Sequence, residues 1–162
     1  MKRFAALALL ALAGAAQAQW KYESEKDAMT DKVERRATLA SPTKVSLPFP
    51  YKGGTVGRLV VWPDVVMVGI SRGQIIGEAD IDVRFDDGPV TRFATRPSSS
   101  GSSTVAYVKF PGFIPGPQHA TEIDRADFMA RLASAKRVRV QLSLYGFGEQ
   151  VFEFAPAGLR LE

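Results

Sequence analysis

Apolar and polar residues alternate at every second position along much of the chain. This period of two is typical of β-strands with one buried face, because successive side chains on a strand point to opposite sides. We predict strands where the alternation holds, over residues 20–23, 33–39, 81–85 and 137–145, and further strands over residues 90–96, 104–110 and 150–154. Residues 58–62 and 65–71 are instead largely apolar and β-branched, which is typical of strands buried on both faces.

Turn-forming residues separate these segments, and one segment has helical character. The Asp-Asp-Gly-Pro sequence at 86–89 predicts a hairpin turn, since aspartate forms local hydrogen bonds and glycine accepts a positive φ. Asp124 is a good N-cap residue, and Ile123 and Phe128 have the spacing of a hydrophobic staple. The apolar residues that follow share one face, so we predict a helix over residues 125–135.

About eight or nine short strands and one helix in the C-terminal third predict a mainly β fold. Strands and helices do not alternate along the chain, which disfavours a parallel nucleotide-binding sheet. We expect a single domain over residues 19–162, built as an antiparallel β-sandwich whose helix covers one end or edge. A small β-barrel is the alternative.

The first 18 residues have the three parts of a cleavable secretory signal peptide. Lys2 and Arg3 form a positive segment, residues 4–16 are apolar, and Ala16-Gln17-Ala18 places small residues where a signal peptidase reads them. A membrane anchor is the alternative, but a spanning helix needs about 20 apolar residues. We therefore expect cleavage after Ala18, no membrane span in the mature chain, and a periplasmic or secreted bacterial protein.

Charge and cysteine content narrow the classes of partner. Cleavage would remove Lys2 and Arg3 and no acidic residue, so the 21 basic residues would become 19 against 17 acidic ones, and the formal charge would fall from +4 to +2. A charge this low gives little reason to expect a nucleic-acid partner. A basic cluster near the predicted helix end fits the helix dipole as a solvated helix end; it comprises Arg131, Lys136, Arg137 and Arg139. Without cysteine, the stability must come from the core.

The chain lacks the residue types of several common catalytic and metal sites. Cysteine is absent and His119 is the single histidine. Cysteine nucleophiles and zinc sites of the usual ligand types are therefore excluded. A Ser-His-Asp relay would depend on His119, whose proline-rich surroundings favour an ordinary exposed side chain, and no Gly-x-Ser-x-Gly sequence is present. We expect no cofactor and no enzymatic activity.

Carboxylates gather in one segment, which contains Glu78, Asp80, Asp82, Asp86 and Asp87. Calcium takes six to eight oxygen ligands, so the four aspartates are candidate calcium ligands, although their spacing is not that of an EF-hand. A glycosidase pair, in which two carboxylates face a cleft, is a second alternative. We favour a solvated strand face on which Arg84 pairs with Asp82 or Asp86.

Large apolar side chains beside glycine or proline in predicted turns form a further group, which comprises Tyr51, Phe113, Ile114 and Phe147. Turns run over the surface, so each side chain either folds back into the core or forms part of a contact surface. A single such residue is explained by packing against the core. Several of them gathered at one end of the sandwich would form a partner site, and the four are our candidate binding residues.

Short motifs in a fixed order support a family resemblance. They are Trp20, Phe49-Pro50-Tyr51 with Gly53-Gly54, the 83–88 strand and turn, Phe128 with Leu132 and Ala135-Lys136, and Phe152-Glu153-Phe154 before Gly158-Leu159. This order resembles small exported proteins of proteobacteria and their phages, whose function is largely unassigned. It is similar, more distantly, to periplasmic accessory proteins of type VI secretion loci. The resemblance implies no catalytic residues.

The predicted function is therefore an exported, non-enzymatic binding or accessory module of the cell envelope. Its expected partner is an envelope protein or a wall component. A carboxylate-dependent glycan hydrolase and a calcium-stabilised binding domain are the alternatives, and both depend on the acidic segment at 78–87.

Overall fold

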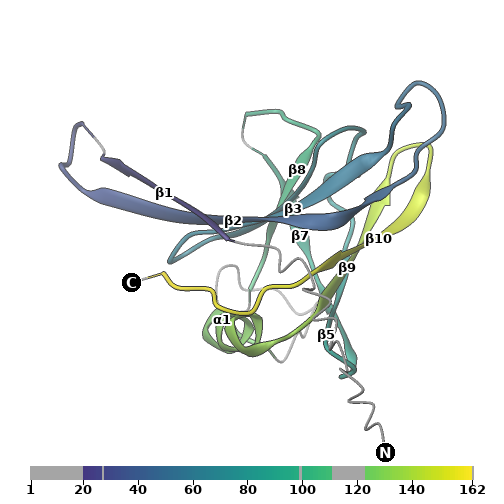
Figure 1. Ribbon diagram of the computed structural model, residues 1–162. Helices are drawn as coiled ribbons and strands as arrows, with labels where there is room; N and C mark the ends of the chain where they lie inside the picture. The colour runs from purple at the N-terminus through teal and green to yellow at the C-terminus, as the bar shows by residue number, and fades with distance from the viewer. Residues whose placement is uncertain (1–19, 27, 99, 111–122, 162) are drawn as a thin grey trace, which may run out of the picture.

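The computed structural model describes residues 20–26, 28–98, 100–110 and 123–161, which form two antiparallel sheets and one helix (Figure 1). The first sheet has six strands in the order β1-β2-β3-β4-β8-β7, with the bounds Lys21–Lys26, Val33–Val45, Thr55–Val61, Val66–Ile70, Val105–Val108 and Thr95–Pro97. The second has four strands in the order β10-β9-β5-β6, with the bounds Gly148–Phe154, Val138–Leu144, Ile81–Phe85 and Val90–Phe93. The helix α1 spans Arg125–Ser134.

The predicted fold class is confirmed over this part of the chain. It is mainly β, its two sheets are antiparallel, and its helix lies in the C-terminal third. The two sheets do not close into one, so the barrel alternative is wrong. The predicted leader at 1–18 and the candidates Phe113, Ile114 and His119 lie outside the described residues.

The inner faces of the two sheets form the core. Every second residue of β9 from Val138 to Leu144 is buried, as the alternation predicts. The opposing sheet contributes Leu59 from β3, which is also fully buried. Gly57 of β3 lies so close to Phe152 of β10 that a Cβ atom at Gly57 would be 2.7 Å from the ring. The sheets therefore pack in direct contact, with no room for a side chain at this point.

The helix begins where its sequence predicts and ends one residue earlier than expected. The side chain of Asp124 accepts a hydrogen bond from the backbone N–H of Asp127 at 2.8 Å. Ile123 and Phe128, the two staple residues, are both buried. The ring of Phe128 meets three others edge to face at centroid separations of 5.3 Å, namely Phe85, Phe93 and Phe110. This aromatic cluster fixes the helix against the sandwich.

One predicted strand, 90–96, is divided between the two sheets. Val90–Phe93 pairs with β5 in the four-stranded sheet, and Thr95–Pro97 pairs with β8 in the six-stranded sheet. The chain crosses from one sheet to the other at Ala94, where the side chain of Thr95 donates a hydrogen bond to the carbonyl of Ala79 at 2.7 Å. The sequence predicted one continuous strand and did not indicate this change of sheet.

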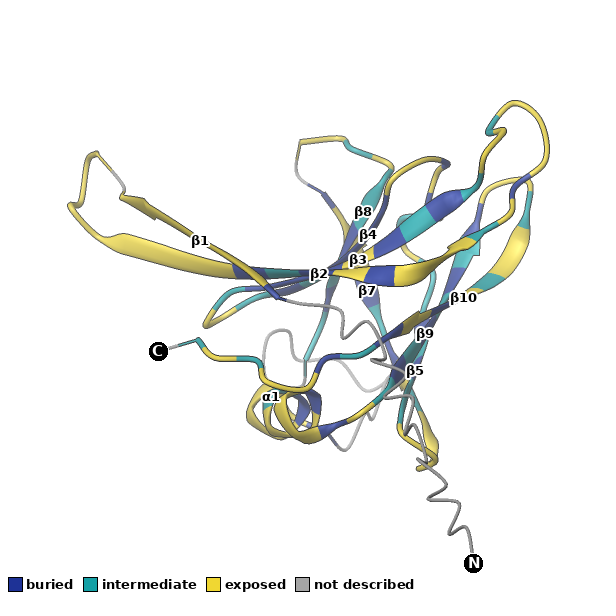
Figure 2. Ribbon diagram, in the orientation of Figure 1, coloured by how far each residue is buried: buried dark blue, intermediate teal, exposed yellow. Residues whose placement is uncertain are grey.

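A two-stranded arm, formed by β1 and residues 33–36 of β2, extends beyond the rest of the six-stranded sheet (Figure 1). All of its residues are exposed, as Figure 2 shows. Only the base of the arm contacts the C-terminal segment. There Trp20 Nε1 donates to the carbonyl of Pro156 at 2.7 Å, and Tyr22 Oη accepts from the backbone N–H of Arg160 at 3.0 Å. The arm has no hydrophobic layer of its own.

Candidate functional site

Two of the candidate binding residues meet at one end of the sandwich. Tyr51 lies in the connection between β2 and β3, and Phe147 lies in the turn between β9 and β10. Their rings are in edge-to-face contact, with centroids 5.7 Å apart and an interplanar angle of 71°. Both rings are partly buried and pack against the core. They therefore join a loop of one sheet to a turn of the other.

Backbone hydrogen bonds hold both connections in place. The N–H of Tyr51 donates to the carbonyl of Pro48 at 3.0 Å, and the N–H of Phe147 donates to that of Leu144 at 3.1 Å. Gly54 follows in the first connection with a φ of +77°, and a Cβ atom there would lie 2.7 Å from the carbonyl oxygen of Val45. Only glycine fits that position without strain, so the loop has one favoured shape.

Two further aromatic residues, which sequence reasoning missed, are exposed in the same two connections. Phe49 is 80% exposed and Tyr145 is 72% exposed. Each precedes a member of the ring pair by two residues, so the signal was an aromatic residue repeated at alternate positions around a turn. We call Phe49, Tyr51, Tyr145 and Phe147 the loop-end site. It combines a partly buried pair of rings with two exposed ones.

Positive groups lie next to the loop-end site. Arg72 Nη1 donates a hydrogen bond to the carbonyl of Lys52 at 2.7 Å, which brings an exposed guanidinium against the loop that carries Tyr51. Lys52 is itself exposed. A surface of aromatic rings flanked by cations suits a partner with apolar and acidic groups, because opposite charges guide association.

The acidic segment does not assemble into a site. Asp82 accepts two hydrogen bonds from Arg92, at 2.8 and 3.0 Å. Asp86 accepts from two backbone N–H groups, those of Lys136 and Arg137, at 3.0 and 2.9 Å. Asp87 forms an ion pair with Arg137 at 2.6 Å. Among the described residues no group of three or more His, Cys, Asp or Glu side chains is placed to hold a metal ion.

The predicted partner of Arg84 is wrong. Its guanidinium donates to the backbone carbonyls of Gly88 and Asp87 within its own turn. Asp82 instead pairs with Arg92, which lies directly opposite it on β6. A cross-strand neighbour is about 5 Å away, closer than a residue two positions along the same strand, so register decides the ion pair.

A small hollow of about 200 Å³ brings Asp80, Asp82 and Glu149 together on the outer surface of the four-stranded sheet. Arg92, which also lines it, donates hydrogen bonds to Asp82 and holds the pKa of that carboxyl below its ordinary value of 3.8. A glycosidase acid needs the opposite, a raised pKa that retains its proton. The hollow therefore offers Asp82 as a permanent carboxylate and not as a proton donor.

The basic cluster is partly engaged by the same acids. Arg137 pairs with Asp87, and Arg139 lies 3.7 Å from Asp87 and 3.5 Å from Glu153. Two of its four cations thus take part in ion pairs on the four-stranded sheet. This arrangement agrees with a solvated helix end.

Comparisons with protein-family models, with curated proteins and with solved structures find no match to this chain. Among the described residues, no helix has the length and apolar character needed to cross a membrane.

Proposed function

We propose that the protein is an exported, non-enzymatic binding module of the cell envelope that contacts its partner through the loop-end site. One observation supports this most directly: Phe49 and Tyr145 are exposed beside the ring pair that fixes their two turns. Rings held on a rigid base lose little conformational entropy on binding and present a large apolar area. The leader sequence supports export.

The proposed partner is an envelope protein or a wall component that offers apolar surface with acidic groups. Lys52 and Arg72 flank the rings and favour such a partner over a basic one. Sandwich folds commonly place binding loops at one end, where the strands hold them in fixed positions. The loop-end site has this arrangement.

Removal of the exposed rings tests the proposal. The full chain is expressed with a C-terminal tag, and the periplasmic fraction is assayed for proteins and wall fragments retained with it. We expect the double variant Phe49→Ala/Tyr145→Ala to retain at least about tenfold less partner than the wild type. A buried interface ring contributes about 2 kcal/mol to the free energy of binding. Purified wall material, added separately, distinguishes a glycan partner from a protein.

A matched control truncates two exposed apolar side chains elsewhere. Met29→Ala/Val90→Ala changes residues that are 93% and 59% exposed on the arm turn and on β6. This control should retain the partner at the wild-type level. Equal retention by both double variants would show that the loop-end site is not the contact surface, and absence of the chain from the periplasm would contradict export.

A further inference from the structure

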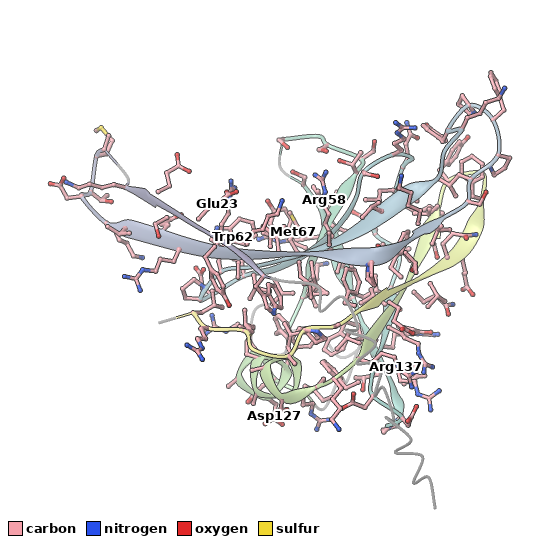
Figure 3. All side chains as sticks on the ribbon, viewed as in Figure 1. Glu23, Arg58, Trp62, Met67, Asp127 and Arg137 are labelled. Carbon is pink, nitrogen blue, oxygen red and sulfur yellow. The ribbon has the colours of Figure 1, made fainter. Side chains whose placement is uncertain are left out.

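The outward face of the six-stranded sheet carries an apolar row outside the core cluster, and in this row Val60 is buried and its neighbours are half-buried. Val60, Met67 and Tyr107 are adjacent in register across β3, β4 and β8. Their side chains point away from the core, because the alternate residues Leu59, Val68 and Ala106 are buried in it. Trp62 lies on the same side, and Figure 3 shows it with Met67 and Arg58 along one face of the sheet.

One end of this face is acidic. Trp62 lines a hollow of about 340 Å³ whose other walls come from the arm and include Glu23, Glu25, Glu34 and Arg36. Glu23 is paired with Arg36. Glu25 and Glu34 lie directly opposite each other in register, and neither forms an ion pair with a described residue. Like charges placed opposite each other destabilise a pair of strands, so a cation brought to this end would relieve the repulsion.

The other end of the face is basic. Arg58 is exposed, lies opposite Ala40 of β2, and forms no ion pair within the described part of the chain. The guanidinium of Arg96 lies over the Tyr107 ring at 5.0 Å from its centroid. The face therefore runs from acidic, through apolar, to basic.

We propose that a second copy of this chain occupies this face, in a two-fold symmetric dimer. On β2, Glu34 and Ala40 are about 20 Å apart along the strand. A two-fold axis across the strands, midway between Glu34 and Ala40, brings Glu34 of each copy over Ala40 of the other, one strand away from Arg58, which lies opposite Ala40. The same rotation brings Trp62 over Val60, one strand away from Met67. A self-complementary surface of this kind is what a two-fold interface requires.

The proposed interface is small. It covers about 20 Å along the strands and about 14 Å across β2, β3, β4 and β8. Interfaces below the standard size associate weakly and reversibly. We therefore expect a weak, rapidly reversible dimer that forms at high protein concentration, whose affinity falls as salt concentration rises because charges at both ends contribute.

Charge reversal tests the dimer with the chain from Gln19 onward, which contains every described residue. Sedimentation velocity over a concentration series should show a monomer–dimer equilibrium. Glu34→Arg and Arg58→Glu each create two like-charge contacts and should weaken association at least about tenfold. A matched reversal of an exposed carboxylate off this face, Glu78→Arg, should leave it unchanged. Circular dichroism checks that each variant folds.

Mixing the two reversed variants provides the decisive result. In a mixed dimer the new arginine of one chain faces the new glutamate of the other, while the remaining contact is wild type. We therefore expect the mixture to dimerise although neither variant does so alone. A wild-type chain that remains monomeric, a dimer that survives both reversals, or a mixture that remains monomeric would overturn the proposal. None of these results bears on the loop-end site.

Discussion

The outer faces of the two sheets share the same strand geometry but expose different side chains. On the four-stranded sheet the outward residues pair across strands, as Asp82 does with Arg92 and Arg139 with Glu153. On the six-stranded sheet the outward positions include the half-buried Trp62, Met67 and Tyr107. The four-stranded face therefore pairs charges across its strands, and its outward apolar residues Val90 and Val151 are exposed among these charges. On the six-stranded face Met67 and Tyr107 adjoin each other in register beside Val60, and we propose that a second copy of the chain covers them.

This difference shows why alternation alone does not identify a contact surface. Outward positions of both sheets fall between buried ones, yet a charged outward residue with a cross-strand partner needs nothing further. An outward apolar row gains free energy when it is covered, at about 25 cal/mol per Å² of buried apolar area. The arrangement of the outward side chains therefore distinguishes a solvated face from the proposed interface.

The largest expected effect comes from filling the space between the sheets. Gly57→Ala places a methyl group 2.7 Å from the Phe152 ring and 2.8 Å from its Cβ, and should destabilise the fold by about 1–3 kcal/mol in urea denaturation. Gly69→Ala is the matched change on the outer face of the same sheet. Gly69 is also buried, but its Cβ would lie 3.2 Å from a methyl of Val105, a half-buried side chain that can shift more easily than the Phe152 ring in the core. Equal destabilisation by the two variants would mean that the inner and outer faces do not differ in packing.

The next effect concerns the turn between β5 and β6 of the four-stranded sheet. Asp86 has a φ of +48° and binds the two backbone N–H groups that follow the helix. Asp86→Ala removes both hydrogen bonds and leaves a residue less suited to positive φ, so we expect a loss of about 2 kcal/mol. Asp86→Asn keeps an acceptor oxygen and should retain more than half of the stabilisation that Asp86→Ala loses. If alanine and asparagine behave alike in thermal unfolding, the hydrogen bonds do not hold the turn.

The smallest effect tests the ion pair on the four-stranded face through pH. Arg92 lowers the pKa of Asp82 in the folded state, so the carboxylate contributes stability at pH values above about 4. The contribution is lost as the pH falls through the lowered pKa. The difference in Tm between wild type and Asp82→Asn should therefore be present near neutral pH and vanish in strong acid. A difference that is independent of pH would assign the effect to packing.

Local features of the fold were predictable from the sequence. Alternation located most of the strands, and Asp124 with the staple pair Ile123 and Phe128 located the helix start. The sheet to which a strand belongs was not predictable, because the division at Ala94 depends on which partners lie on either side. Long-range register is set by the whole core and not by the strand itself.

The loop-end site was predictable in part. Tyr51 and Phe147 are large apolar residues in predicted turns, which makes them candidate binding residues. The structure places them in contact. That contact depends on how the β2–β3 connection meets the β9–β10 turn, which neither segment encodes alone. Phe49 and Tyr145 were missed because exposed rings have the same sequence signal as buried ones. The binding role of all four remains a prediction.

Thiol labelling tests the difference between the two outer faces most directly, since the chain contains no cysteine. Met67→Cys places one thiol on the outer face of the six-stranded sheet, and Gln141→Cys places one on the outer face of the four-stranded sheet. The rate of maleimide labelling is measured at low and high protein concentration. We predict that labelling of the Met67→Cys variant slows as concentration rises, while that of the Gln141→Cys variant does not change. The same concentration dependence at both positions, or none at either, would contradict the assignment of the six-stranded face as the dimer interface.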